Sequence, residues 1–244
     1  MAETLFIADI HLDERHPALI EAFQTFLTRR VKYSAGLYIL GDLFEFWHGD
    51  DENNLVYLEI LRSLKNITSN GVPIYFIRGN RDFLVGKGFA QQTGCQLLDD
   101  EVIINLNKIN ILLMHGDNLC TDDLAYQKWK KWRLKPHNQY IQKFYLMLPL
   151  FVRRFISRQV RQKSRQETQK KPREIMDVSQ QTVEEIMQKY QVTYLIHGHT
   201  HRPNHHKFKL NQDVAHRFVL DAWYERGNAL IFNGQDFHLE YFNS

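Results

Sequence analysis

Short apolar runs alternate with longer amphipathic segments over the first third of the chain. The runs at 4–10, 37–40 and 72–77 have the length and apolar content of buried strands. Between them, the segments 17–31 and 55–67 repeat their apolar residues at helical spacing. Because strands and helices alternate in this order, the sequence predicts an α/β fold.

The same pattern returns near the C-terminus after a long interruption. A hairpin is predicted at 101–114, but from 122 to about 190 the strand signal disappears and the segment is helical, aromatic and basic. Strands resume at 192–196, 207–210, 217–220, 229–232 and 237–242. We therefore expect one domain spanning 1–244, with a helical lid inserted at about 122–175.

The insertion carries most of the charge asymmetry. Residues 128–173 contain 15 Lys and Arg against one acid, Glu167, so this segment is +14 and the rest of the chain is −11. Such asymmetry marks a surface for phosphate, nucleic acid or an anionic membrane. The longest apolar run, 144–152, has nine residues, so no membrane span is expected. The N-terminal stretch contains Glu3 and Asp9 and has no basic start, so no signal peptide is expected either.

Polar residues of the kinds that bind metals follow five of the predicted strands. They occur as Asp9-Ile10-His11, Gly41-Asp42, Gly79-Asn80-Arg81-Asp82, His115-Gly116-Asp117 and Gly198-His199-Thr200-His201. Ligands of open α/β sheets bind at the carboxyl ends of the strands, and the loops there present side chains from a fixed sheet. Five such pieces in order predict a metal site.

The spacing within the motifs suggests a local geometry. In an extended backbone, residues two apart point to one side, so we expect Asp9 with His11, and His199 with His201, to do so. We expect Gly41, Gly79 and Gly198 to allow tight turns at positive φ. The donors are oxygen and imidazole, which suit Mn²⁺ or a related six-coordinate ion better than a tetrahedral structural zinc.

These five motifs resemble those of the calcineurin-like metallophosphoesterases. The resemblance implies a four-layered fold, with two mixed β-sheets between helices. It implies two metal ions bridged by Asp42. One would be held by Asp9, His11, Asp42 and His201, and the other by Asp42, Asn80, His115 and His199. It also implies catalytic roles for Asp42, Asn80, Arg81 and His115, with a hydroxide activated by the two metals attacking phosphorus.

Arg81 departs from the wider family, in which many members have histidine at this position. Arginine does not donate a proton usefully at neutral pH, but its guanidinium can bind phosphate oxygens in a bidentate manner. A phosphate leaving group needs no proton. Arg81 therefore favours cleavage of a diphosphate over hydrolysis of an alkyl monoester. Alternatively, Arg81 has only a structural role and forms a surface salt bridge with Asp82.

A narrower resemblance covers the whole chain. The segments GNRDFL (79–84), HGDNLCTDD (115–123), LPLFVR (148–153), IMDV (175–178) and LIHGHTHRP (195–203) together resemble the UDP-2,3-diacylglucosamine pyrophosphatases of the Gram-negative lipid A pathway. This resemblance implies attack on the uridine-side phosphorus with Mn²⁺ as cofactor, giving UMP and 2,3-diacylglucosamine 1-phosphate. The implied substrate contacts are Asn80, Arg81, Asp123, Ser164, Thr168, Lys171 and His199. Thr168 stands where close relatives have Asn.

The insertion is consistent with that substrate, because two acyl chains need apolar surface and a membrane headgroup layer attracts positive charge. We expect a monomer bound peripherally at the cytoplasmic face of the inner membrane, with no nucleic-acid partner. His48 near the second motif is either substrate-facing or part of a loop. Alternatively, the insertion is a helical cap that packs its apolar face on the body of the protein and has solvated charges.

Three other functions stay open from the residues alone. A soluble nucleotide pyrophosphatase or phosphodiesterase would share the chemistry but would not need the insertion. A scaffold without catalysis would be expected to lose metal ligands, yet all seven positions are filled here. A nuclease would use the basic segment, but its aromatic residues come with aliphatic ones at helical spacing, which is typical of a lipid-binding or core face.

Overall fold

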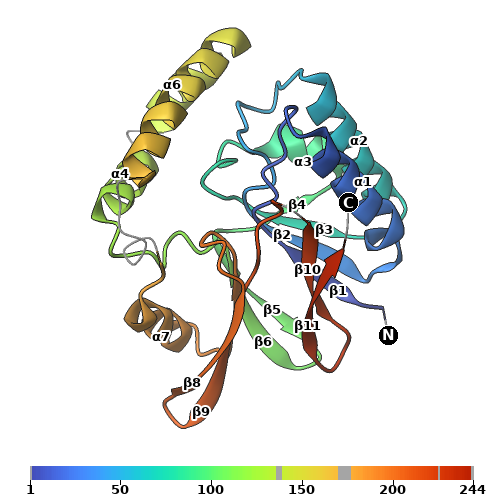
Figure 1. Ribbon diagram of the computed structural model, residues 1–244, viewed down its shortest axis with the longest axis vertical. Helices are drawn as coiled ribbons and strands as arrows, with labels where there is room; N and C mark the ends of the chain where they lie inside the picture. The colour runs from blue at the N-terminus through green and yellow to red at the C-terminus, as the bar shows by residue number, and fades with distance from the viewer. Residues whose placement is uncertain (1, 136–138, 170–176, 225, 243–244) are drawn as a thin grey trace.

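Two β-sheets lie between helices in the computed structural model, which describes residues 2–135, 139–169, 177–224 and 226–242 (Figure 1). The described helices are α1 (Pro17–Arg29), η1 (Val31–Tyr33), α2 (Leu55–Ser69), α3 (Lys87–Thr93), α4 (Leu124–Leu134), α5 (Gln139–Met147), α6 (Leu150–Gln169) and α7 (Gln180–Lys189). The described strands are β1 (Thr4–Ile7), β2 (Gly36–Leu40), β3 (Ile74–Ile77), β4 (Gln96–Leu97), β5 (Glu101–Leu106), β6 (Ile109–Met114), β7 (Tyr194–His197), β8 (Asn204–Leu210), β9 (Asp213–Val219), β10 (Gly227–Phe232) and β11 (Phe237–Phe242).

The first sheet has the order β11-β10-β1-β2-β3-β4, and β1 to β4 run parallel. Strand β1 is buried on both faces, which explains its continuous apolar sequence. Leu5 and Ile7 pack in the core formed with α1, α2 and α3, whereas Phe6 and Ala8 pack in the core between the two sheets. The period of two along β1 thus assigns its side chains to two separate cores.

The second sheet has the order β5-β6-β7-β9-β8 and is also mixed. Its inner face packs against the first sheet, and its outer face packs against α7, where Val183 and Met187 are fully buried. The layers are therefore helices, sheet, sheet and helix, as Figure 1 shows. The predicted four-layered α/β fold is confirmed.

Most predicted elements form, with differences at their ends. The first strand ends at Ile7 and not at residue 10, because the backbone turns into a left-handed conformation at Asp9. The hairpin at 101–114 turns at Asn107-Lys108, as predicted. Helix α3 and strand β4 were not predicted from the sequence, because seven and two residues are too short for a clear period.

Helix α6 extends beyond the sheets (Figure 1) and is attached to the loop after β2 through Arg153. The guanidinium of Arg153 is almost fully buried. It donates to the carbonyl oxygens of His48 (2.7 Å) and Leu148 (2.9 Å) and to Asp51 Oδ1 (2.8 Å). The burial of this charge is therefore compensated by several hydrogen bonds. Among the described helices, none is both long enough and apolar enough to cross a bilayer.

Candidate metal centre

The five motifs meet where parallel strands of both sheets end. Backbone hydrogen bonds join their loops: Asp9 N–H donates to Gly41 O (3.1 Å), His11 N–H to Asp42 O (3.0 Å), and Gly198 N–H to His115 O (2.9 Å). The first and second sheets therefore present their polar loops to one shared site.

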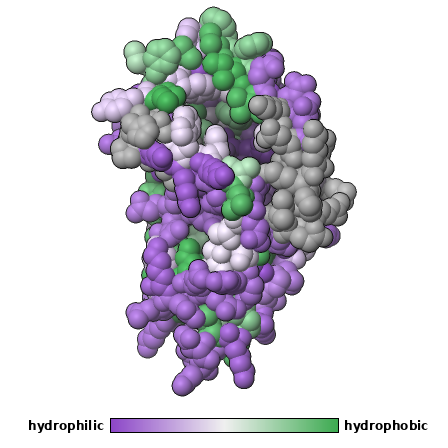
Figure 2. Space-filling model, turned by 90° about the vertical axis from the view of Figure 1, so that its left-hand side faces the viewer, coloured by the Kyte–Doolittle hydropathy of each residue, from purple (hydrophilic) through white to green (hydrophobic). Residues whose placement is uncertain are grey.

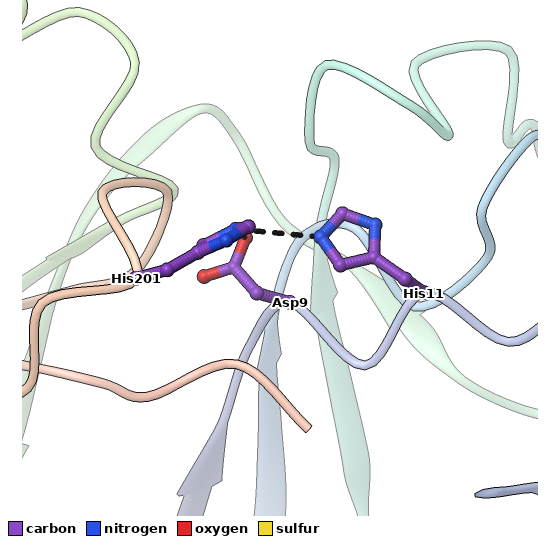
Figure 3. A group of neighbouring side chains, drawn as sticks. All are labelled: Asp9, His11 and His201. Carbon is purple, nitrogen blue, oxygen red and sulfur yellow. Dashed lines mark hydrogen bonds and ion pairs between the residues drawn. The ribbon is translucent and has the colours of Figure 1, made fainter. Parts of the chain in front are cut away.

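A continuous chain of contacts joins all seven predicted ligands. On one side His201 Nε2 lies 3.4 Å from Asp9 Oδ1 and 3.4 Å from His11 Nε2 (Figure 3). Asp9 Oδ2 accepts a hydrogen bond from the His199 backbone N–H (2.6 Å), which connects this group to the second one. Donor atoms of Asp9, His11 and His201 all lie within 4.8 Å of one another.

The second group is centred on the buried ring of His115. Its Nε2 lies 3.0 Å from Asn80 Oδ1, 3.2 Å from His199 Nδ1 and 3.7 Å from Asp42 Oδ1. The donor atoms of Asp9, Asp42 and His115 also lie within 4.8 Å of one another. Two adjacent clusters of oxygen and imidazole donors thus exist, which is the arrangement that a dinuclear site requires.

The hydrogen bonding and the protonation of the predicted ligands also fit metal ions. Asp9 Oδ1 is buried without a hydrogen-bond partner, although an unsatisfied buried polar atom costs about 1–3 kcal/mol. Burial lowers the pKa of His11 and lowers that of His199 to about 3, so both rings are neutral and can offer a lone pair. Burial also opposes protonation of His115, but Asp42 and Asp9 outweigh it and raise its pKa to about 9. The site therefore has a negative potential that cations would neutralise.

The backbone geometry of the ligands differs from the expected extended pairs. Five ligands lie in the left-handed region, with φ between 52° and 71°: Asp9, His11, Asp42, His199 and His201. This conformation costs roughly 1–2 kcal/mol for a non-glycine residue, and Asp is among the residues that tolerate it best. The side chains converge because the loops are turned, and not because two residues share one face of a strand.

The glycines of the motifs also have different roles from those expected. Gly41 has φ +88°, as predicted, but Gly79 and Gly198 are not among the residues at positive φ. A Cβ on Gly79 would lie 2.1 Å from Asp42 Oδ1, and one on Gly198 would lie 2.3 Å from Asp9 Oδ2. These two glycines therefore allow the carboxylates of Asp42 and Asp9 to approach the neighbouring backbone.

Asp82 of the third motif has a structural role that the sequence analysis did not assign. It is fully buried, and its carboxylate accepts hydrogen bonds from Leu43 N–H (2.7 Å) and Gly79 N–H (2.8 Å). It therefore connects the second and third motif loops, and its burial excludes the surface salt bridge with Arg81. Burial and the charge of Asp42 raise the pKa of Asp82 to about 7.

The predicted substrate residues are only partly brought to the site. Arg81 donates its backbone N–H to Asp42 Oδ1 (2.8 Å), and its Nε is buried without a hydrogen-bond partner. Asp123 accepts from the Tyr126 N–H (3.1 Å) at the start of α4, and Ser164 is exposed on α6. The side chain of Thr168 and all of Lys171 lie outside the described residues.

Two further contacts support the histidine ligands and had no signal in the sequence. Tyr224 Oη lies 2.7 Å from His201 Nδ1, and Glu45 Oε2 lies 3.2 Å from His11 Nδ1. Such partners orient the ring of a metal-binding histidine. Tyr224 comes from the loop between β9 and β10, which carries none of the five motifs, whereas Glu45 lies in the loop after β2 that also carries Gly41-Asp42.

Replacing Asp82 should test whether this carboxylate holds the motif loops together. Asp82→Ala leaves two buried N–H groups without acceptors, so we expect the free energy of unfolding of the metal-free protein to fall by about 3 kcal/mol. Urea unfolding measures this loss. Asp99→Ala, at an exposed carboxylate, should change stability by about 0.5 kcal/mol or less. Equal stability of the two variants would contradict the assigned role.

Comparisons with known proteins agree with this geometry. The sequence model of the calcineurin-like phosphoesterase family matches residues 3–203. The chain is 47% identical to a UDP-2,3-diacylglucosamine hydrolase of Salmonella paratyphi B over 93% of each chain. It is 46% identical to a UDP-2,3-diacylglucosamine hydrolase of Escherichia coli O7:K1 over 98% of each chain.

A solved archaeal phosphodiesterase shares the fold, with a TM-score of 0.50 at 11% identity over 98% of this chain and 99% of that one. The family expected from the five motifs is therefore confirmed by sequence and by fold. The chain belongs to the calcineurin-like phosphoesterase family and, within it, to the family of the UDP-2,3-diacylglucosamine hydrolases.

Proposed function

We propose that the protein hydrolyses UDP-2,3-diacylglucosamine to UMP and 2,3-diacylglucosamine 1-phosphate by attack at the uridine-side phosphorus. The observation that carries this proposal is the chain of contacts that joins the seven predicted metal ligands beside Arg81. The identity to hydrolases of that name over almost the whole chain supports the substrate.

The donor set fits two Mn²⁺ ions, since it consists of carboxylate, amide and imidazole groups without thiolate. Asp9, His11, Asp42 and His201 would hold one ion, and Asp42, Asn80, His115 and His199 the other, with Asp42 shared. When bound, two such ions neutralise phosphoryl charge and lower the pKa of water between them.

Arg81 would complete the neutralisation of the diphosphate. Its backbone is fixed by Asp42, and its planar guanidinium can donate two parallel hydrogen bonds to phosphate oxygens. The departing sugar phosphate needs no proton, so the reaction requires no general acid at this position. Asn80, Asp123, Ser164, Thr168, Lys171 and His199 are the further substrate contacts in this proposal.

Helices α4 to α6 would form a lid that also meets the inner membrane. Five large apolar side chains of α5 and α6 are more than 60% exposed: Tyr140, Phe144, Met147, Phe151 and Phe155. Figure 2 shows hydrophobic side chains gathered at the end of the molecule that α6 reaches. Exposed apolar patches of this kind mark interaction sites, and the acyl chains of the substrate are in a membrane. We propose a monomer, peripheral at the cytoplasmic face, without a nucleic-acid partner.

Product analysis tests the reaction directly. With Mn²⁺ in detergent and ¹⁸O water, we expect UMP carrying ¹⁸O from UDP-2,3-diacylglucosamine, and no hydrolysis of UDP-glucose or a bis-nucleotide. Mass spectrometry detects the label, and Asp42→Ala should abolish turnover. Hydrolysis of the soluble substrates instead would favour a soluble nucleotide pyrophosphatase. No hydrolysis with two ions bound would favour a scaffold.

Arg81→Ala should separate catalysis from metal binding. Loss of its contacts to developing phosphoryl charge should lower kcat/KM by about 100-fold or more. The ion content, measured by mass spectrometry of the dialysed protein, should stay at two per chain. Arg81→Lys should recover only part of the rate, because lysine lacks the planar fork. Loss of metal in Arg81→Ala would show that the role is misassigned.

A charge placed on the exposed apolar face should weaken membrane binding. We expect Phe151→Glu to reduce co-flotation with vesicles containing anionic lipid several-fold, because it opposes both apolar insertion and attraction of the basic segment. Tyr33→Glu is the matched control, since Tyr33 is 72% exposed and Phe151 is 73% exposed. Equal losses in the two variants would contradict a specific membrane face.

A further inference from the structure

A cavity of about 570 Å³ lies between α6 and the loops that follow β1 and β2. Its volume is within the range of small-molecule sites. Glu45 lines the cavity and also contacts the ligand His11, with 3.2 Å between Oε2 and Nδ1. The cavity therefore begins directly beside one edge of the metal centre, and neither the motifs nor the proposed ligands account for it.

The charges on the cavity wall balance one another. Its lining contains four carboxylates and four arginines. Three of these arginines are ion-paired within the wall: Arg15 with Asp13, Arg154 with Glu52 and Arg161 with Glu45. Paired guanidinium groups offer little net attraction to a further anion. The wall suits a neutral, polar occupant better than a phosphate group.

The cavity also has an aromatic face and neutral hydrogen-bonding groups. The rings of Phe46 and His48 stack with their centroids 4.9 Å apart, and both line the cavity. Burial lowers the pKa of His48 to about 4, so this ring is neutral at physiological pH. Its Nδ1 lies 3.2 Å from Ser157 Oγ, and the amide of Gln162 also lines the wall. Stacking rings with mixed donors and acceptors are what a pyrimidine base and its ribose need.

A second cavity adjoins the opposite edge of the metal centre. This cavity, of about 320 Å³, is lined by His115, by apolar side chains such as Phe83 and Leu146, and by charged ones such as Asp117 and Lys130. The first cavity therefore adjoins the His11 edge and the second adjoins the His115 edge, and only the first has the stacked rings of Phe46 and His48 in its wall. A diphosphate at the metal centre would have one of these cavities on each side.

We infer that the cavity between α6 and the β1 and β2 loops binds the uridine of the substrate, with Phe46 and His48 beside the base. This inference rests on the proposed function, which supplies the nucleoside. The uridine-side phosphorus would then lie toward His11, and the sugar carrying the acyl chains would extend toward His115. No covalent step is involved, since the cavity only binds and orients one end of the diphosphate.

Product inhibition tests the assignment of the two ends. We expect Phe46→Ala and His48→Ala each to raise the inhibition constant of UMP at least tenfold. The inhibition constant of 2,3-diacylglucosamine 1-phosphate should change less than twofold, which also shows that the variants are folded. Phe83→Ala, in the second cavity, should leave inhibition by UMP unchanged. A rise confined to the lipid product in the Phe46 and His48 variants would overturn the inference.

A crystal of the protein with Mg²⁺ and 5-bromo-UMP separates this inference from the proposed function. We expect the anomalous bromine peak in the first cavity, next to Phe46. A peak there in a protein that does not hydrolyse UDP-2,3-diacylglucosamine would keep the nucleoside site and reject the proposed function. Hydrolysis of that substrate together with a bromine peak elsewhere would reject the nucleoside site and keep the function.

Discussion

The close approach of buried carboxylates and imidazoles at the shared edge of two sheets is the constraint on which this structure depends. Asp9, Asp42 and His115 are each at most 2% exposed, and their donor atoms lie within 4.8 Å of one another. Two carboxylates at such distances repel each other unless a cation lies between them. The fold keeps these side chains close together because the strands end at the same edge and backbone hydrogen bonds link the loops. Asp82 joins two of these loops through further hydrogen bonds. Metal binding can then recover the electrostatic cost.

The sequence predicted the layers and the set of side chains that lie together, but not the way in which these side chains converge. Apolar strands followed by Asp, His or Gly are visible as a pattern, because a parallel sheet puts its loops at one edge. The left-handed backbone of His11 and His201 leaves no such pattern, since histidine is compatible with both conformations. The role of Asp82 in connecting two loops could not be predicted for another reason. Its role depends on backbone N–H groups from two loops, and an aspartate next to Arg81 looks like half of a surface salt bridge.

Part of the positive charge of the insertion has a structural role. Composition alone could not distinguish this role from attraction to an anionic membrane. Arg153, Arg154 and Arg161 of α6 pair with Asp51, Glu52 and Glu45 of the acidic body. Part of the +14 charge therefore attaches α6 across the loop after β2. The aromatic side chains that remain exposed, such as Phe151 and Phe155, are the stronger argument for a lipid surface, because no comparable pairing explains their exposure.

Glu45 joins three features of the molecule that are distant in sequence. Its carboxylate pairs with Arg161 on α6, lies beside His11 in the metal centre and forms part of the wall of the polar cavity. A movement of α6 would therefore alter the partner of Glu45, and through it the orientation of a metal-binding ring. The same helix lines the cavity, so Glu45 connects the cavity wall and α6 with the predicted ligand His11.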